Sequence, residues 1–216
     1  MSFISWLRSR RLKNEAMSEA SAGRLRQAVP LLREYVRRNP RDAEAMYRLA
    51  DSEAHLGNSD EAERWYRDLL GLLPDHAEAK EGLALAMAER RLADVASAVR
   101  LIEEIRPDYR RMGLDDFICL DLAWVHHLGG DNDTARRHLD QAREHGIVES
   151  LAEVDRYYGG IEFSEAHYRL GILLAILGED REKAAHHLRR GLDLSPESTY
   201  AREAVRLLAE HGEKDG

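Results

Sequence analysis

The chain has 216 residues, 33% of them charged, and its formal net charge of -8 argues against general binding to nucleic acid. Its single cysteine, Cys119, excludes an intramolecular disulfide framework and fits a reducing compartment. No apolar run approaches the roughly 20 residues that a membrane-spanning helix needs, and the N-terminus lacks the apolar core of a secretory signal, so we expect a cytoplasmic protein.

The N-terminal part of the chain is basic, unlike the rest. Residues 1–40 carry nine Lys or Arg and three Asp or Glu, a net charge of +6, which leaves -14 for the remainder. We interpret residues 1–8 as an extension that packs on the first repeat unit. The alternative is a peripheral anchor on the cytoplasmic membrane face, with Phe3, Ile4 and Trp6 in the lipid interface. Arginines fall among the apolar residues on a helical wheel, so membrane contact is the less favoured interpretation.

A spacing of 34 residues recurs along the chain. It separates Pro40 from Pro74 and Ala62 from Ala96. A small residue twelve positions before a proline also recurs, and such a residue lets two helices approach closely where they cross. Ala96 and Pro107 form a pair that is one residue shorter. The full pairs are Ala28 and Pro40, Ala62 and Pro74, and Ala184 and Pro196.

Residues 41–74 show what one period contains. Apolar residues recur at spacings of three and four in two segments, which predicts two amphipathic helices. Gly57 ends the first helix, Asp60 caps the second and Pro74 stops it. A helix pair of this size cannot bury its apolar face alone, so it needs similar neighbours. The inner positions are Leu49, Ala50, Ala54 and Leu56, then Ala62, Trp65, Tyr66, Leu69 and Leu70.

This period resembles the tetratricopeptide repeat, a family motif of 34 residues. Residues 43–74 match its pattern except at Met46, where the family has an aromatic residue, and residues 164–196 match it with one extra residue in the turn. The resemblance implies an all-α fold, a right-handed α-solenoid of about five such helix pairs with a C-terminal capping helix. The matching residues are Leu49, Ala50, Gly57, Ala62, Tyr66 and Pro74, then Leu170, Gly171, Gly178, Ala184 and Pro196.

The repeat spacing also predicts the divisions of the chain. In the third repeat we expect Ala96, Val99, Ile102 and Ile105 to face the core and residues 107–115 to form a connector. The predicted units are the extension over 1–8, four repeats over 9–146, an irregular insertion over 147–163, a fifth repeat over 164–196, a capping helix over 197–211 and a frayed tail over 212–216.

Two segments depart from the regular pattern. Residues 147–163 are expected to hold a short helix over about 148–157 and a loop at Gly159–Gly160, and they either form a functional surface or adjust the curvature of the solenoid. At the C-terminus, Ser195 can cap and Pro196 can start the last helix. Its inward-facing residues are expected to be Tyr200, Ala204, Val205, Leu207 and Leu208.

The sequence offers no pattern typical of catalysis. It has no phosphate-binding glycine loop, nucleophile elbow or dinucleotide fingerprint, so we predict no catalytic residue and no cofactor. The ten histidines include no helical metal-binding motif, and His186 and His187 are expected on an outer helix surface, so no metal site is predicted. Cys119 takes a core position of the fourth repeat, which favours an inert buried thiol.

The resemblance implies where a partner binds. In this family the first helix of each pair lines a concave groove that takes an extended or helical peptide. We carried the groove positions of the family onto this chain, repeat by repeat. They give Lys13, Met17, Glu44, Tyr47, Arg48, Asp51, His55, Glu78, Glu81, Leu85, Glu89, Phe117, Leu120, Asp121, Trp124, His127, Glu165, Tyr168, Arg169 and Ile172.

This predicted groove is acidic in repeats two and three and aromatic or apolar in repeats four and five. We therefore expect a partner protein segment that is basic at one end and apolar at the other. Tyr47, Trp124 and Tyr168 are the expected hot spots, although Trp124 can equally pack within the stack. The predicted function is a non-enzymatic scaffold or adaptor, and the alternative is a membrane-peripheral assembly factor docked through the N-terminal segment.

Overall fold

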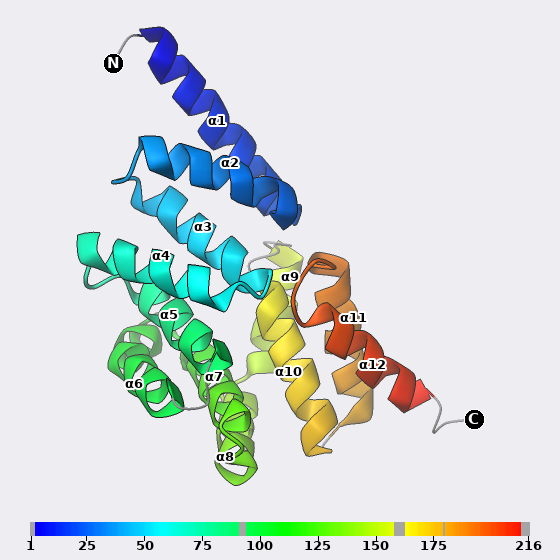
Figure 1. The fold of residues 1–216 in the computed structure, drawn as a ribbon. Helices are drawn as coiled ribbons and strands as arrows, with labels where there is room; N and C mark the ends of the chain where they lie inside the picture. Colours follow the sequence, from blue (N-terminus) through cyan, green and yellow to red (C-terminus); the bar gives the residue numbers. More distant parts are fainter. Residues whose placement is uncertain (1–2, 91–93, 158–162, 179, 213–216) are drawn as a thin grey trace.

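The computed structural model describes residues 3–90, 94–157, 163–178 and 180–212, and this part of the chain contains no β-strand (Figure 1). Among the helices that it describes, none combines the length and apolar character required to span a bilayer. The helices are α1 (Phe3–Ser21), α2 (Leu25–Arg38), α3 (Ala43–His55), α4 (Ser59–Leu72), α5 (Ala77–Arg90), α6 (Val95–Met112), α7 (Asp115–Leu128), α8 (Asn132–Glu144), α9 (Ile147–Tyr157), α10 (Ser164–Leu177), α11 (Arg181–Leu194) and α12 (Ala201–Gly212).

The helices form five pairs that stack side by side (Figure 1). The pairs are α1 with α2, α3 with α4, α5 with α6, α7 with α8, and α10 with α11, while α9 and α12 are additional. Each pair also packs on the next one, so each covers the apolar flank of its neighbour. The predicted α-solenoid of about five helix pairs is confirmed.

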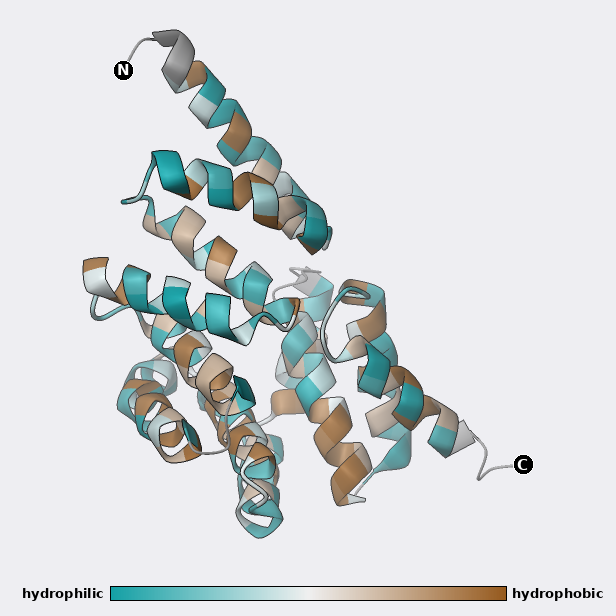
Figure 2. Cartoon of the chain, in the orientation of Figure 1, coloured by the Kyte–Doolittle hydropathy of each residue, from teal (hydrophilic) through white to brown (hydrophobic). Residues whose placement is uncertain are grey.

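The hydrophobic core runs along the stack rather than filling one centre. Three clusters of buried side chains follow each other, the first within α1–α5, the second between α5 and α7, and the third from α7 to α12. Much of α10 is brown in Figure 2, whereas the visible side of α4 is largely teal. The hydrophobic residues thus concentrate where inner helices are covered by other repeats.

The third repeat differs from the prediction in its second helix. Ala98 is fully buried, whereas the predicted inner residue Ala96 is exposed. Pro107 does not end the helix, because α6 continues to Met112, so the predicted connector over 107–115 is largely helical. The backbone hydrogen bond that Pro107 cannot donate would have gone to the carbonyl of Glu103. Both residues are exposed, so water can satisfy this carbonyl.

The C-terminal helix starts later than predicted. It begins at Ala201, and residues 196–200 form turns, so Pro196 does not open it. The turns dock on the N-terminal half of the stack: the Thr199 amide donates to the His55 carbonyl at 2.7 Å, and the Arg26 amide donates to Glu197 Oε2 at 3.0 Å. The expected inward position of Val205 is wrong, because this side chain is 56% exposed.

Gly57 makes this docking possible. Its φ of 78° lies in the left-handed region, which a side chain disfavours. A Cβ atom there would lie 2.7 Å from Thr199 Oγ1. A glycine is therefore needed both to turn the chain between α3 and α4 and to let the C-terminal turn approach.

Three smaller predictions can be compared with the structure, with mixed outcomes. Helix α4 begins at Ser59 with Asn58 at the N-cap position, so Asp60 is not its cap. The Asp60 carboxylate instead accepts a hydrogen bond from Arg90 at 3.1 Å. A helix in the insertion is confirmed by α9, while the loop at Gly159–Gly160 lies outside the described residues. His186 is exposed as predicted, but the prediction for its neighbour His187 is wrong, because His187 is buried with its Nδ1 atom 2.9 Å from that of His167.

Residues 3–8 continue the first repeat as helix. Trp6 and Leu7 lie in the first turns of α1 and are 46% and 45% exposed. Arg10 lies over the Trp6 ring, 5.4 Å from its centroid. In Figure 1 this end of α1 extends beyond α2.

Candidate functional site

The concave face of the stack holds a cleft of 830 Å³. Helices α3 and α5 form one wall, and α10 faces them from the fifth repeat. The stack therefore curves enough for repeats two, three and five to border one space. This space is the candidate site.

The wall from repeats two and three is acidic. Glu44 and Asp51 of α3 and Glu78 and Glu81 of α5 border the cleft. The side chains of Glu44 and Glu78 are 65% and 58% exposed, so both carboxylates are accessible to a partner. Tyr47 lies among these carboxylates. This wall suits basic groups of a bound segment.

Another part of the cleft lining is apolar. Met112 at the end of α6 is 57% exposed there, and Leu114 follows it. Phe117 and Phe163 lie with ring centroids 5.8 Å apart, and Val154 of α9 also lines the cleft. The insertion therefore contributes directly to the cleft wall. The long α6 does so as well, since Met112 lies beyond Pro107.

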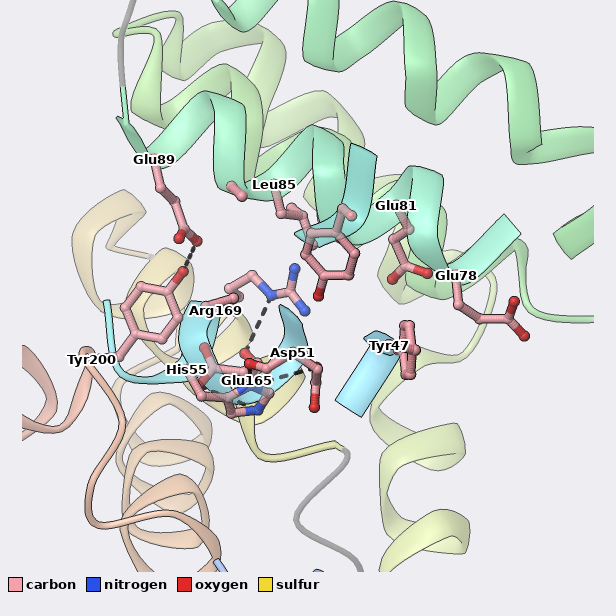
Figure 3. Close-up of a pocket in the computed structure, with 14 residues that line it drawn as sticks. Tyr47, Asp51, His55, Glu78, Glu81, Leu85, Glu89, Glu165, Arg169 and Tyr200 are labelled. Carbon is pink, nitrogen blue, oxygen red and sulfur yellow. Dashed lines mark hydrogen bonds and ion pairs between the residues drawn. The ribbon is translucent and has the colours of Figure 1, made fainter. Parts of the chain in front are cut away.

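A smaller cavity of 110 Å³ shares part of its wall with the cleft and lies at its inner side (Figure 3). Arg169 of α10 points into it, and its Nη1 atom pairs with the Asp121 carboxylate at 2.8 Å. His55 lies 3.7 Å from the Glu165 carboxylate and 3.5 Å from that of Asp51. The cavity wall thus includes several charged side chains.

Burial and crowded carboxylates perturb the acid groups of this region. Burial raises the pKa of Glu81 well above its usual value, and the charge of Asp121 raises it further. Burial also raises the pKa of Glu89 to about 7. Burial alone would lower the pKa of His55, but the charges of Asp51 and Glu165 raise it above its ordinary value. The acidic side chains of this region therefore outnumber its basic ones.

The structure brings most predicted groove residues of repeats two, three and five together. One group lines the cleft or the cavity. It comprises Glu44, Tyr47, Arg48, Asp51, His55, Glu78, Glu81, Leu85, Glu89, Phe117, Glu165 and Arg169.

Five other predicted groove residues are buried inside the fold, because α10 packs against α7 and the C-terminal turns cover this side. Trp124 donates to Glu89 at 3.4 Å and packs edge-on against Tyr200, and the Tyr168 hydroxyl donates to the Ser195 carbonyl at 2.9 Å. We leave these residues out of the candidate surface. They are Leu120, Asp121, Trp124, Tyr168 and Ile172, which are 4% exposed or less.

The remaining predicted residues lie elsewhere. Lys13 on α1 pairs with Glu44 at 2.7 Å at the rim, Met17 packs in the core of the first repeats, and His127 accompanies Trp124 with ring centroids 5.7 Å apart. The sequence reasoning missed several residues of the cleft and cavity. They are His76, Tyr109, Met112, Leu114, Val154, Phe163 and Tyr200.

One cluster has the side chains of a metal site, although the sequence predicts none. Asp115, Cys119 and His145 offer ligand atoms within 4.8 Å of one another. Arg106 already pairs with Asp115 at 2.9 Å and lies 3.4 Å from the Cys119 sulfur. Burial raises the pKa of Cys119 to about 11, so the thiol is protonated at neutral pH. An arginine thus takes the position that a cation would need.

The stacked pairs and the concave cleft define a helical-repeat protein. A tetratricopeptide-repeat model matches residues 13–77, and a second such model matches residues 118–141. These matches show that the chain contains tetratricopeptide repeats, and the stacked helix pairs agree with them. Folds of this family typically serve as non-enzymatic scaffolds for protein–protein interaction.

Solved structures show the same architecture. The thermophilic TPR protein TTC0263 of Thermus thermophilus is 18% identical, with a TM-score of 0.61 over 93% of this chain and 99% of that one. MamA 41-end from Desulfovibrio magneticus RS-1 is 18% identical, with a TM-score of 0.52 over 86% of this chain and 94% of that one. At such identities the likeness concerns the fold alone. No curated protein sequence matches the chain.

Proposed function

We propose that this protein is a scaffold that holds a segment of another protein in its concave cleft, through basic residues at one end of the segment and apolar residues at the other. The observation that carries the proposal is the composition of the 830 Å³ cleft. Accessible carboxylates border one part, and an exposed methionine with two phenylalanines borders the other. Charge complementarity would orient the segment, and the apolar anchors would supply most of the affinity.

The exposed residues of the cleft allow a test that does not disturb the core. Protein capture from the native host is measured with the purified full chain as bait. Met112→Asp removes the apolar anchor point, and Glu78→Lys reverses one charge of the acidic wall. We expect each variant to lose its specific partner at least tenfold, since such contacts are worth about 1–2 kcal/mol or more in interface centres.

Matched controls lie on the outer surface. Val205→Asp changes a residue of α12 that is as exposed as Met112, at 56% against 57%, and Glu182→Lys reverses an exposed charge on α11. Both controls should capture the partner like the parent chain. Equal capture by the cleft variants and the controls, with the fold intact by circular dichroism, would refute the cleft as the binding surface.

Peripheral contact with a membrane is a second candidate function. The exposed Trp6 and Leu7, with Arg10 beside them, favour it, since aromatic and arginine side chains suit a lipid interface. Co-sedimentation with anionic vesicles tests it, with the full chain compared with Trp6→Ala and Leu7→Ala. Vesicle binding that falls in both variants would support this candidate, and no binding by the parent chain would exclude it.

A further inference from the structure

The inner cavity has more acidic than basic side chains in its wall. Five carboxylates line it, those of Asp51, Glu78, Glu81, Glu89 and Glu165. The cationic groups in its wall are a histidine and an arginine, and this arginine is already paired with an aspartate behind the wall at 2.8 Å. The cavity therefore has acceptor groups for a further cation.

Neutral donors hold two of these carboxyl groups in place. Glu89 accepts hydrogen bonds from the Tyr200 hydroxyl and the Trp124 indole, and the Tyr109 hydroxyl donates to Glu81. A phenol or an indole orients a carboxylate but brings no positive charge. The raised pKa of Glu89, about 7, reflects burial first and the nearby charge of a second glutamate among the other causes. A bound cation would relieve this repulsion.

A tyrosine hydroxyl at the cavity wall is a second, independent feature that suits a ligand. Tyr66 lines the cavity and is 2% exposed, yet its hydroxyl group makes no hydrogen bond to another described residue. The ring is held against Gly82, where an added Cβ atom would lie 2.5 Å from the hydroxyl oxygen. Because a hydroxyl can both donate and accept, it can form a hydrogen bond with a polar ligand that enters the cavity.

The walls and size suit the end of a long basic side chain. Tyr47 and Tyr66 lie with ring centroids 6.2 Å apart, and Tyr200 adds a third aromatic ring to the wall. Aromatic rings attract cations as carboxylates do. The volume of 110 Å³ exceeds the share of about 30 Å³ that one water molecule takes in the liquid, so a headgroup of several atoms fits.

We propose that this cavity receives one cationic side chain, arginine or lysine, of the segment that the cleft holds. The proposal rests on the proposed function and deepens it, because it assigns the basic end of the segment to a defined pocket. The side chain reaches the cavity from the cleft, since both share Tyr47, Asp51, Glu78, Glu81 and Arg169. Its charge pairs with the carboxylates, and the Tyr66 hydroxyl bonds it or a water that accompanies it.

Capped amino acids are suitable probes because no partner is needed. The full chain is titrated with N-acetyl-arginine methylamide, N-acetyl-lysine methylamide and N-acetyl-citrulline methylamide, and binding is followed by NMR chemical shifts. Citrulline has the shape of arginine without its charge. We expect saturable shifts at cavity residues with arginine, lysine or both, and binding of citrulline that is weaker by about tenfold or more. The stronger of the two cationic probes identifies the side chain.

Two conservative variants and a control locate the probe. Glu89→Gln removes one charge and keeps the shape, and Tyr66→Phe removes only the unpartnered hydroxyl. Each should weaken the cationic probe about threefold or more, whereas Glu182→Gln on the outer helix α11 should not. If the cationic probes do not bind, or bind like citrulline, or bind Glu89→Gln as well as the parent chain, the cavity is not a cation pocket.

Partner capture separates this proposal from the function on which it rests. If Met112→Asp abolishes capture but the cationic probes do not bind, the cleft stands and the pocket fails. If the probes bind the cavity but Met112→Asp and Glu78→Lys capture the partner normally, the pocket stands as a cation site and the proposed function fails.

Discussion

Repeats two and three are neighbours with the same sequence period, yet they are built differently. Helix α4 has 14 residues and ends before Pro74, whereas α6 has 18 residues and passes through Pro107. The additional turns of α6 place Tyr109 and Met112 at the concave face. A deviation from the repeat thus produces part of the candidate site, and a perfect copy of repeat two would lack it.

The inner helices of the two repeats also differ at equivalent positions, 34 residues apart. Tyr47 corresponds to Glu81, and His55 corresponds to Glu89. The two repeats therefore present different chemistry to one cavity, with an aromatic ring and an imidazole from one and carboxylates from the other. Identical repeats could not build such a mixed site.

The largest effect is expected at the junction between the two repeats. Gly82 of α5 lies against the Tyr66 ring of α4, so Gly82→Ala forces a clash in the core. We expect the free energy of unfolding to fall by about 3 kcal/mol. Gly71→Ala is the matched control in α4, since nothing lies within 4 Å of its added methyl group, and it should stabilise by about 0.5–1 kcal/mol. Urea unfolding of both variants provides the measurement, and similar values would contradict this packing.

The two prolines should respond differently to the same substitution. Pro107→Ala restores a backbone hydrogen bond within α6 and should raise the free energy of unfolding by about 2 kcal/mol. Pro74→Ala lies beyond the end of α4 and should change it by less than about 1 kcal/mol. Thermal unfolding by circular dichroism compares them. A destabilised Pro107→Ala would mean that α6 ends at this proline, as α4 ends before its own.

Glu89, which takes the position in repeat three equivalent to His55, should make stability depend on pH. The pKa of Glu89 is raised from 4.5 to about 7, so between these values the folded chain binds more protons than the unfolded one. Stability from this group is therefore lost as pH rises from about 4.5 to 7, by at most about 1.4 kcal/mol per pH unit.

Glu89→Gln removes this titration while keeping the shape of the side chain. Its free energy of unfolding should exceed that of the parent chain at pH 8, and the two should converge at pH 4.5. Chemical denaturation at the two pH values measures the difference. If the difference in free energy of unfolding between Glu89→Gln and the parent chain were the same at both pH values, Glu89 would have an ordinary pKa in the folded chain.

The smallest effect concerns the starts of α3 and α5. The Asp42 carboxylate accepts from the Ala45 amide at 3.2 Å, and His76, 34 residues later, accepts from the Ala79 amide at 3.3 Å. Asp42 also accepts from Lys13 and from the Tyr35 hydroxyl. We expect Asp42→Ala to cost about 1–2 kcal/mol and His76→Ala about 0.5 kcal/mol in urea unfolding. If both substitutions lowered the free energy of unfolding equally, the bonds of Asp42 to Lys13 and Tyr35 would contribute nothing beyond the helix cap.

Much of the fold could be predicted from the sequence, because helix pairs are local. The spacing of apolar residues and the breaks at Gly57 and Pro74 define repeat two without reference to the rest of the chain. The prediction failed where the same signals had a different context. The pattern predicts that a helix ends at Pro107, but in the tertiary structure this proline lies within α6, on its exposed face. The buried small residue of α6 is accordingly Ala98, two positions after the predicted Ala96.

The candidate site was predictable in part for the same reason. Family positions place Glu44, Tyr47 and Glu78 on the inner helices, and these residues do border the cleft. The same positions in repeats four and five gave Trp124 and Tyr168, which the fold buries. Position within a repeat determines which way a side chain points, but not what lies in front of it.

By itself the sequence determined the helix pairs, their order and the sign of charge on each inner helix, since these depend on residues within one period. Only the tertiary structure decided how far the stack curves, because small rotations between repeats add up along the chain. That curvature brings Tyr200 to Glu89, 111 residues away, and sets α10 opposite α3 and α5. The cavity and its cluster of acidic side chains exist only because these distant segments meet.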